Sequence, residues 1–107
     1  MQIVTLASRL RFSDEKLVKV GLFETDRLYC DLYCLQPGQS QKIHTHGGSD
    51  KIYYVLDGRA SVQVGAERQE LMPGQAVLAP SGMEHGVANA ATGPLSLLVF
   101  MAPKPSH

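Results

Sequence analysis

The sequence predicts an all-β protein built as a sandwich or a barrel. Short runs of β-branched, aromatic and other apolar residues recur along the chain, and turn residues such as Pro37-Gly38 and Asp57-Gly58 separate them. No long stretch shows the 3.6-residue apolar period of an amphipathic helix. Short strands at this spacing, with hardly any helix, are typical of antiparallel sandwiches and barrels.

The first half of the chain supplies five of the expected strands. These are residues 3–10, 17–23, 28–35, 42–46 and 51–56. A turn is expected at 24–27 and a loop at 47–50, and residues 13–16 offer at most one helical turn. Residues 51–56 are apolar or aromatic on both faces, so this strand is expected to be central, with cover on both sides.

The second half continues the same pattern to a polar, proline-rich tail at 103–107. The expected strands are 60–64, 68–71, 76–79, 85–89 and 95–101. We see no internal repeat and no linker, so residues 1–107 are expected to form a single domain.

The bulk composition excludes several classes of partner. Ten basic and ten acidic side chains balance, so we expect neither nucleic acid nor a membrane surface to bind. No apolar run reaches the roughly 18 residues of a transmembrane helix. The N-terminus has no basic region followed by an apolar one, so we expect a cytoplasmic protein without a secretory signal.

The two cysteines, Cys30 and Cys34, lie four residues apart in one expected strand. That spacing is about 13 Å along a strand. A disulfide needs Cα atoms within about 7 Å, so no bridge between them is expected. This agrees with a reducing compartment. A metal-binding role is the alternative to two small buried side chains on one strand face, and we favour burial.

Two histidines give the first indication of a metal site. His44 and His46 are two residues apart, so in a strand both side chains project from the same face. Two imidazoles that converge in this way suit a divalent metal ion. The alternative is a pair of exposed strand histidines.

Two separated stretches, 38–58 and 74–89, resemble the two signature motifs of the cupin superfamily, in its small single-domain form. The first holds Gly38, His44, His46 and Gly58 at the spacings of that motif. The second fits without departure at Gly74, Pro80, Gly82, His85 and Asn89. The resemblance covers roughly half of the chain. The glycines and prolines also make sense independently, because they stand where strands must turn sharply at barrel corners.

The resemblance implies a double-stranded β-helix, which is a jelly-roll barrel, with a divalent metal near its mouth. His44, His46 and His85 match the three histidine ligands of the family. The metal would be Fe, Mn, Ni or Zn. The family's fourth ligand is a glutamate, and Lys51 stands at its position, six residues before Gly58.

Lys51 leaves three outcomes open. Asp50 is the candidate fourth ligand if a bulge turns it inward. The metal keeps three histidines, with water or substrate in the remaining positions. Or the site has lost its metal, with Lys51 held outside or paired to a carboxylate. An ammonium cannot coordinate a cation unless it loses a proton.

Lys51 and Tyr53 are also candidate substrate-binding residues. Tyr53 and Tyr54 alternate, so one is expected to line the cavity and the other to pack outside. The alternatives are plain core aromatics and a solvated edge lysine. Asn89 is expected to satisfy backbone groups, and Glu84 is expected to point away from its neighbour His85.

The sequence supports more than one function. The first hypothesis is a metal-dependent enzyme, of dioxygenase, isomerase or decarboxylase type, acting on a small organic acid or carbonyl compound. The alternative is a non-catalytic module that binds a small ligand, or a structural dimeric domain. The apolar outward residues Ile52, Tyr54 and Leu56, with residues 3–10, are candidate contacts of a homodimer.

Overall fold

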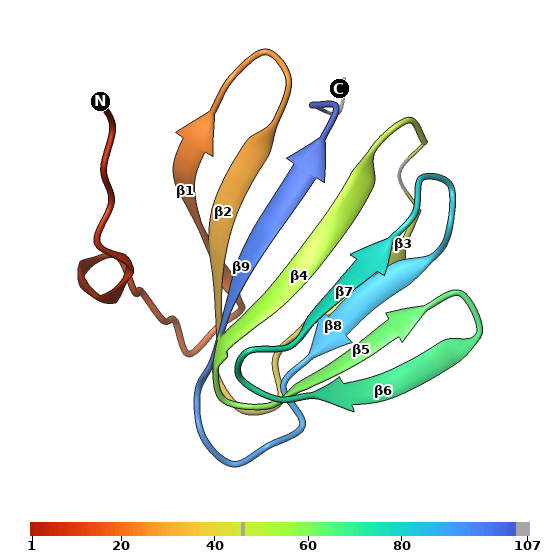
Figure 1. Ribbon diagram of the computed structural model, residues 1–107. Helices are drawn as coiled ribbons and strands as arrows, with labels where there is room; N and C mark the ends of the chain where they lie inside the picture. The colour runs from red at the N-terminus through yellow and green to blue at the C-terminus, as the bar shows by residue number, and fades with distance from the viewer. Residues whose placement is uncertain (46, 105–107) are drawn as a thin grey trace.

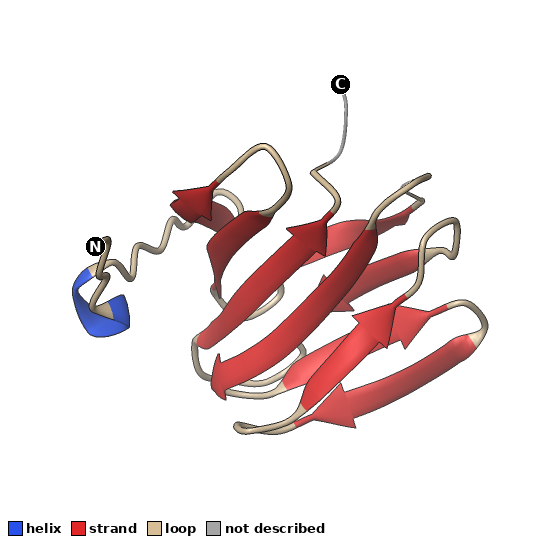
Figure 2. Cartoon of the chain, turned by 45° about the horizontal axis from the view of Figure 1, so that its top comes forward, coloured by secondary structure: helices blue, strands red, loops and turns tan. Residues whose placement is uncertain are grey.

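Two antiparallel sheets face each other and enclose the core (Figures 1 and 2). The computed structural model describes residues 1–45 and 47–104. The strands are β1 (Val18–Glu24), β2 (Tyr29–Leu35), β3 (Ser40–His44), β4 (Asp50–Asp57), β5 (Ala60–Val64), β6 (Glu67–Leu71), β7 (Ala76–Ala79), β8 (His85–Ala88) and β9 (Leu95–Ala102). The five-stranded sheet has the order β1-β2-β9-β4-β7, and the four-stranded sheet has the order β3-β8-β5-β6.

The pairing is nested along the chain. β2 pairs with β9, β3 with β8, β4 with β7 and β5 with β6. The two halves of the chain therefore run side by side and wind together, with the β5–β6 hairpin at the closed end. This confirms the predicted all-β, double-stranded β-helix fold.

Side-chain alternation fills the space between the sheets. Along β4, Lys51, Tyr53 and Val55 are buried, whereas Asp50, Ile52 and Tyr54 are exposed. The main core consists of eleven buried residues from both sheets. They are Tyr33, Leu35, Tyr53, Val55, Ala60, Val62, Leu71, Val87, Leu95, Leu97 and Val99.

The prediction of a strand at 3–10 is wrong. Only a short 3-10 helix, η1 (Leu6–Ser8), forms there, and none of its residues is buried. Figure 1 shows the segment before β1 standing beside the five-stranded sheet without joining it. Apolar composition alone suggested a strand, but within the described chain no sheet edge pairs with this segment.

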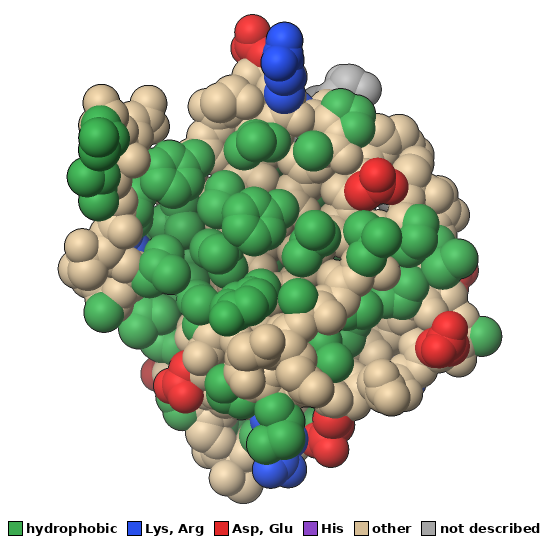
Figure 3. Space-filling view, viewed as in Figure 1, with side chains coloured by type: hydrophobic (Ala, Val, Ile, Leu, Met, Phe, Trp, Pro, Cys, Tyr) green, Lys and Arg blue, Asp and Glu red, His purple; other side chains and the backbone are tan. Residues whose placement is uncertain are grey.

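The outer face of the five-stranded sheet is strongly apolar (Figure 3). Toward β1, a second cluster of Val20, Leu32 and Cys34 is buried beneath Phe12 and its neighbours. Toward β7, apolar side chains remain 37% to 53% exposed; these are Ile52, Tyr54, Leu78 and Phe100. Within residues 1–45 and 47–104, the expected cover on the outer side of β4 is therefore missing.

Gly58 closes the tight turn between β4 and β5. Its φ is +91°, in the region that L side chains rarely adopt. A Cβ there would collide with the backbone oxygen of Pro94 and lie 2.9 Å from the Cα of Leu95. The positive φ of residue 58 and the short distance to the backbone of Pro94 and Leu95 both require glycine at this end of the first motif.

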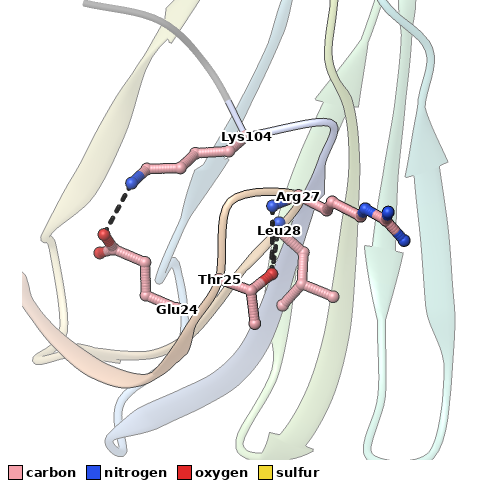
Figure 4. A network of polar contacts seen from close by, with 5 residues as sticks. All are labelled: Glu24, Thr25, Arg27, Leu28 and Lys104. Atoms are coloured by element: carbon pink, nitrogen blue, oxygen red, sulfur yellow. Dashed lines mark hydrogen bonds and ion pairs between the residues drawn. The ribbon is translucent and has the colours of Figure 1, made fainter.

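The β1–β2 hairpin is held at its turn by polar contacts (Figure 4). Thr25 Oγ1 accepts hydrogen bonds from the backbone nitrogens of Arg27 (3.1 Å) and Leu28 (3.2 Å). Lys104 Nζ donates to Glu24 Oε2 at 2.8 Å. The first residues of the predicted tail therefore contact the body of the protein, while residues 105–107 lie outside the described chain.

Two expectations from the sequence concern the cysteines and membrane-spanning helices. Cys30 and Cys34 are both free and buried on the outer face of β2. No helix within residues 1–45 or 47–104 is long and apolar enough to cross a membrane.

Candidate functional site

Two of the predicted metal ligands lie against each other. His44 at the end of β3 pairs in register with His85 at the start of β8. Their ring centroids are 4.4 Å apart, with 61° between the ring planes. His85 is fully buried and His44 is half-buried. His46, the third predicted ligand, lies outside the described residues.

A β-bulge positions the first histidine. The β3–β8 register shifts between Gln41 and His44. Three residues apart on a regular strand, these two side chains would face opposite sides of the sheet. The extra residue of the bulge allows both Gln41 and His44 to face the interior, where each contacts inner side chains.

Backbone carbonyls fix the tautomers of both rings. His44 Nδ1 lies 2.7 Å from the carbonyl oxygen of Lys42, and His85 Nδ1 lies 3.0 Å from that of Met83. A carbonyl can only accept, so each Nδ1 carries a proton. In the neutral ring, Nε2 then offers its lone pair, which is the arrangement of metal-binding histidines.

The surroundings of His44 favour its neutral form. Burial lowers the pKa of His44 most strongly, the hydrogen bond with the Lys42 carbonyl raises it, and the charges of Lys51 and Lys19 lower it further. A neutral imidazole is the form that binds a metal ion.

Lys51 lies inside the barrel with only 1% of its surface exposed. Its Nζ donates to Gln41 Oε1 at 3.2 Å and lies 5.3 Å and 5.1 Å from the ring centroids of Tyr33 and Tyr53. Burial lowers the pKa of Lys51 to about 7, the charge of Lys19 adds to that effect, and Asp31 opposes it. The alternative of a solvated edge lysine is therefore wrong.

Gln41 joins the polar side chains of the interior, and the sequence reasoning missed it. Its Oε1 accepts hydrogen bonds from Lys51 Nζ and from Tyr53 Oη (2.7 Å), while its Nε2 donates to Tyr33 Oη at 3.2 Å. The bulge allows Gln41 to face the interior together with His44, and no residue type in the sequence signals that bulge.

Tyr53 faces the interior, as alternation predicted, and Tyr54 faces outward. The Tyr53 ring centroid lies 6.3 Å from that of His85 and 6.5 Å from that of Tyr33. Burial raises the pKa of Tyr33 to about 12 and that of Tyr53 still further. Both phenols therefore remain protonated donors at neutral pH.

The geometry of Asp50 does not support its candidate role as a fourth ligand. Its side chain is exposed on the opposite face of β4 from Lys51. Its Oδ1 accepts a hydrogen bond from the backbone nitrogen of Ser81 at 2.9 Å. No bulge turns it inward, because the register of β4 with β7 and β9 is regular through Lys51, Ile52 and Tyr53.

Asn89 serves the backbone, as the sequence suggested. It is 1% exposed, and its Nδ2 donates to the carbonyl oxygens of Leu35 (3.0 Å) and Gly93 (2.9 Å). Its Oδ1 accepts from the backbone nitrogen of Ala91. Glu84 is exposed.

The described donor set fits a metal ion only in part. His44 and His85 present suitable tautomers within reach of a common point. No group of three histidine, cysteine, aspartate or glutamate side chains comes together within residues 1–45 and 47–104. A complete set of three therefore depends on His46.

Comparisons with known proteins agree with this fold. Residues 31–101 match a family described as "Cupin domain". TT1209 from Thermus thermophilus, whose crystal structure is solved, is 48% identical, with a TM-score of 0.96 over 98% of this chain and 100% of that chain. The uncharacterized protein SCO3923 of Streptomyces coelicolor is 32% identical over 95 residues, which is 89% of this chain and 80% of that protein.

One more distant structure carries an enzyme name. A predicted oxalate decarboxylase from Thermotoga maritima is 22% identical with a TM-score of 0.78, over 81% of this chain and 80% of that chain. At this identity the likeness shows a shared fold alone.

Proposed function

Because the chain belongs to the Cupin domain family, we propose that it binds a divalent metal ion through His44, His46 and His85 at the mouth of the barrel. The metal, which is Fe, Mn, Ni or Zn, would hold a small organic acid or carbonyl compound. The observation that carries the proposal is the pair of imidazoles 4.4 Å apart, each with Nδ1 on a backbone carbonyl.

The chain's own residues account for much of this function. The two backbone carbonyls orient the rings, so little conformational entropy is lost when a metal binds. Burial of His85 and the apolar core beneath it restrict water at the site. When bound, the metal supplies a Lewis acid that polarises an oxygen of the ligand.

A non-catalytic binding module is the second candidate. Lys51 replaces the acidic residue that the family motif would place here, and Asp50 faces the other side of β4. General acid–base catalysis needs a positioned group near the reacting atoms. The interior does provide the phenols of Tyr33 and Tyr53, but neither is an effective base at neutral pH because burial raises its pKa.

Metal analysis tests the proposal. We expect protein purified without added metal to carry a divalent ion, or to bind one tightly on reconstitution with Mn²⁺, Fe²⁺, Ni²⁺ or Zn²⁺. The variants His44→Ala and His85→Ala should lose it, whereas Asp50→Asn should keep it. Folded wild-type protein that binds none of the four ions would overturn the proposal.

We also propose that two copies pair through the outer face of the five-stranded sheet. The segment before β1 and this sheet border an apolar hollow of about 510 Å³, lined mainly by Val4, Leu6, Leu22, Phe23, Leu28, Cys30, Leu98 and Phe100. Met1 and Ile3 of the same segment are largely exposed. An apolar arm beside an apolar face suits a two-fold dimer, in which each arm covers the other copy's sheet.

Light scattering coupled to gel filtration tests the dimer. We expect twice the chain mass for the wild type and a monomer for Tyr54→Lys or Phe100→Lys. Gln69→Lys on β6, also exposed, is the matched control and should remain dimeric. A monomeric wild type at micromolar concentration would rule the dimer out. The histidines face the space between the sheets, so this dimer leaves the proposed metal site uncovered.

A further inference from the structure

The barrel interior holds a cationic centre beside the histidine pair. Lys51 Nζ lies 5.3 Å from the Tyr33 ring centroid, and Lys19 Nζ lies 5.2 Å from the same centroid. Lys51 is buried, whereas Lys19 on β1 is exposed. The aromatic rings of Tyr33 and Tyr53 therefore flank an ammonium that has left water.

Most of the hydrogen-bond donors of this centre are not used by the protein. Within residues 1–45 and 47–104, one acceptor, Gln41 Oε1, serves the three protons of Lys51 Nζ. Tyr33 Oη accepts from Gln41 Nε2, and that bond does not use the phenol's own proton. The centre thus offers two ammonium protons and one phenol proton.

Charged neighbours also act on this centre. Of the carboxylates, Asp31 acts electrostatically on both Lys19 and Lys51, yet neither described ion pair involves these three residues. Two lysines therefore act on Asp31, and Glu24 is a further carboxylate that acts on it. A buried ammonium with a single neutral acceptor is costly unless a negative charge approaches it.

We propose that Lys51 Nζ and Tyr33 Oη bind the carboxylate of a small organic acid inside the barrel. The inference rests on the proposed function in one respect, since it names the ligand class for the same barrel interior. Gln41 is the positioning residue, because its Oε1 holds Lys51 and Tyr53 while its Nε2 holds Tyr33.

A carboxylate matches the centre in charge and shape. Its negative charge would stabilise the protonated form of Lys51, which burial disfavours. Its two oxygens can accept separately from an ammonium and from a phenol, as charge-assisted hydrogen bonds. The Tyr33 and Tyr53 rings and the buried side chain of Val99 then offer apolar surface to the carbon skeleton of the acid.

A surface hollow at the β1–β2 edge borders Asp31. This hollow, of about 240 Å³, is lined by Gly21, Leu22, Phe23, Glu24 and Asp31. Gly21 presents no side chain toward Asp31, whose Oδ1 would lie 3.9 Å from a Cβ at that position. Asp31 therefore lines this hollow and also acts electrostatically on Lys51.

The test is an NMR titration of metal-free full-length protein with sodium acetate, at constant ionic strength set with sodium chloride. Removing metal with a chelator prevents acetate from being detected through a bound ion. Acetamide, which has the same shape without the charge, is the ligand control. Lys51→Met and Tyr33→Phe are the site variants, and the exposed Lys16→Met is the matched control.

We expect saturable shifts of amides around Lys51 and Tyr33 with acetate, and none with acetamide or chloride. Affinity should fall at least tenfold in Lys51→Met and several-fold in Tyr33→Phe, and it should be unchanged in Lys16→Met. Equal affinity in wild type and a folded Lys51→Met, or an equal response to acetamide or to chloride alone, would overturn the inference. Because no metal is present, this failure is distinct from a failure of metal binding.

Discussion

Lys51 Nζ donates to Gln41 Oε1 across 3.2 Å of the barrel interior, so an amide receives the ammonium that stands where the family motif has an acid. The two residues come from different sheets, β4 and β3. Their contact ties the sheets together beside the histidine pair.

The first prediction concerns the pH dependence of stability. Burial lowers the pKa of Lys51 to about 7 in the folded protein, whereas an unfolded lysine has a pKa of about 10.4. Between these values the unfolded chain binds more protons, so the stability contributed by this residue rises with pH. At or below pH 7 the buried lysine costs stability, on the order of several kcal/mol.

Lys51→Met should therefore be more stable than the wild type at pH 6, and the difference should shrink as pH rises toward 10. Urea unfolding at several pH values measures it. Lys16→Met controls for removal of a surface charge. A constant difference between wild type and Lys51→Met across this range would contradict the prediction.

The second prediction concerns metal affinity. Lys51→Glu restores a carboxylate at the position that the motif assigns to a ligand, and it removes a positive charge that acts on His44. The affinity for Mn²⁺ or Zn²⁺ should rise by about tenfold or more. A tenfold change corresponds to about 1.4 kcal/mol, which is the interaction energy that shifts a pKa by one unit. Calorimetric titration measures this change. Asp50→Glu, on the outer face, is the control and should bind as the wild type does.

The third prediction compares neighbouring tyrosines. Tyr53→Phe removes the 2.7 Å hydrogen bond to Gln41 and leaves a buried amide oxygen with one donor fewer. It should cost about 1–2 kcal/mol of unfolding free energy. Tyr54→Phe, on the outer face of the same strand, should change stability by less than about 0.5 kcal/mol. Similar losses at the two positions would show that the Gln41 contact contributes little.

The fourth prediction concerns the turn at Gly58. Alanine there must adopt φ of +91° and must displace the backbone at Pro94. Gly58→Ala should therefore cost more than about 2 kcal/mol, or prevent folding. Gly93→Ala has no heavy atom within 4 Å of the new Cβ and should be nearly neutral. Thermal unfolding of the two variants compares the costs directly.

The alternation of side chains and the positions of turn residues were enough to predict much of the fold. Alternation along β4 predicted that Tyr53 and Tyr54 face opposite sides of the strand, because the strand period is two. Turn residues located most strand ends. The strand predicted at residues 3–10 was wrong, because apolar composition does not distinguish a strand within the sheet from an exposed arm beside it.

The sequence by itself determined the fold family and assigned His44 and His85 to one site, since the spacings of the two motifs match those of the family. Only the tertiary structure decided the surroundings of Lys51. A bulge in β3, invisible in residue types, lets Gln41 and His44 both face the interior. Burial between the sheets then converts an ordinary lysine into a desolvated cation held by an amide and two aromatic rings.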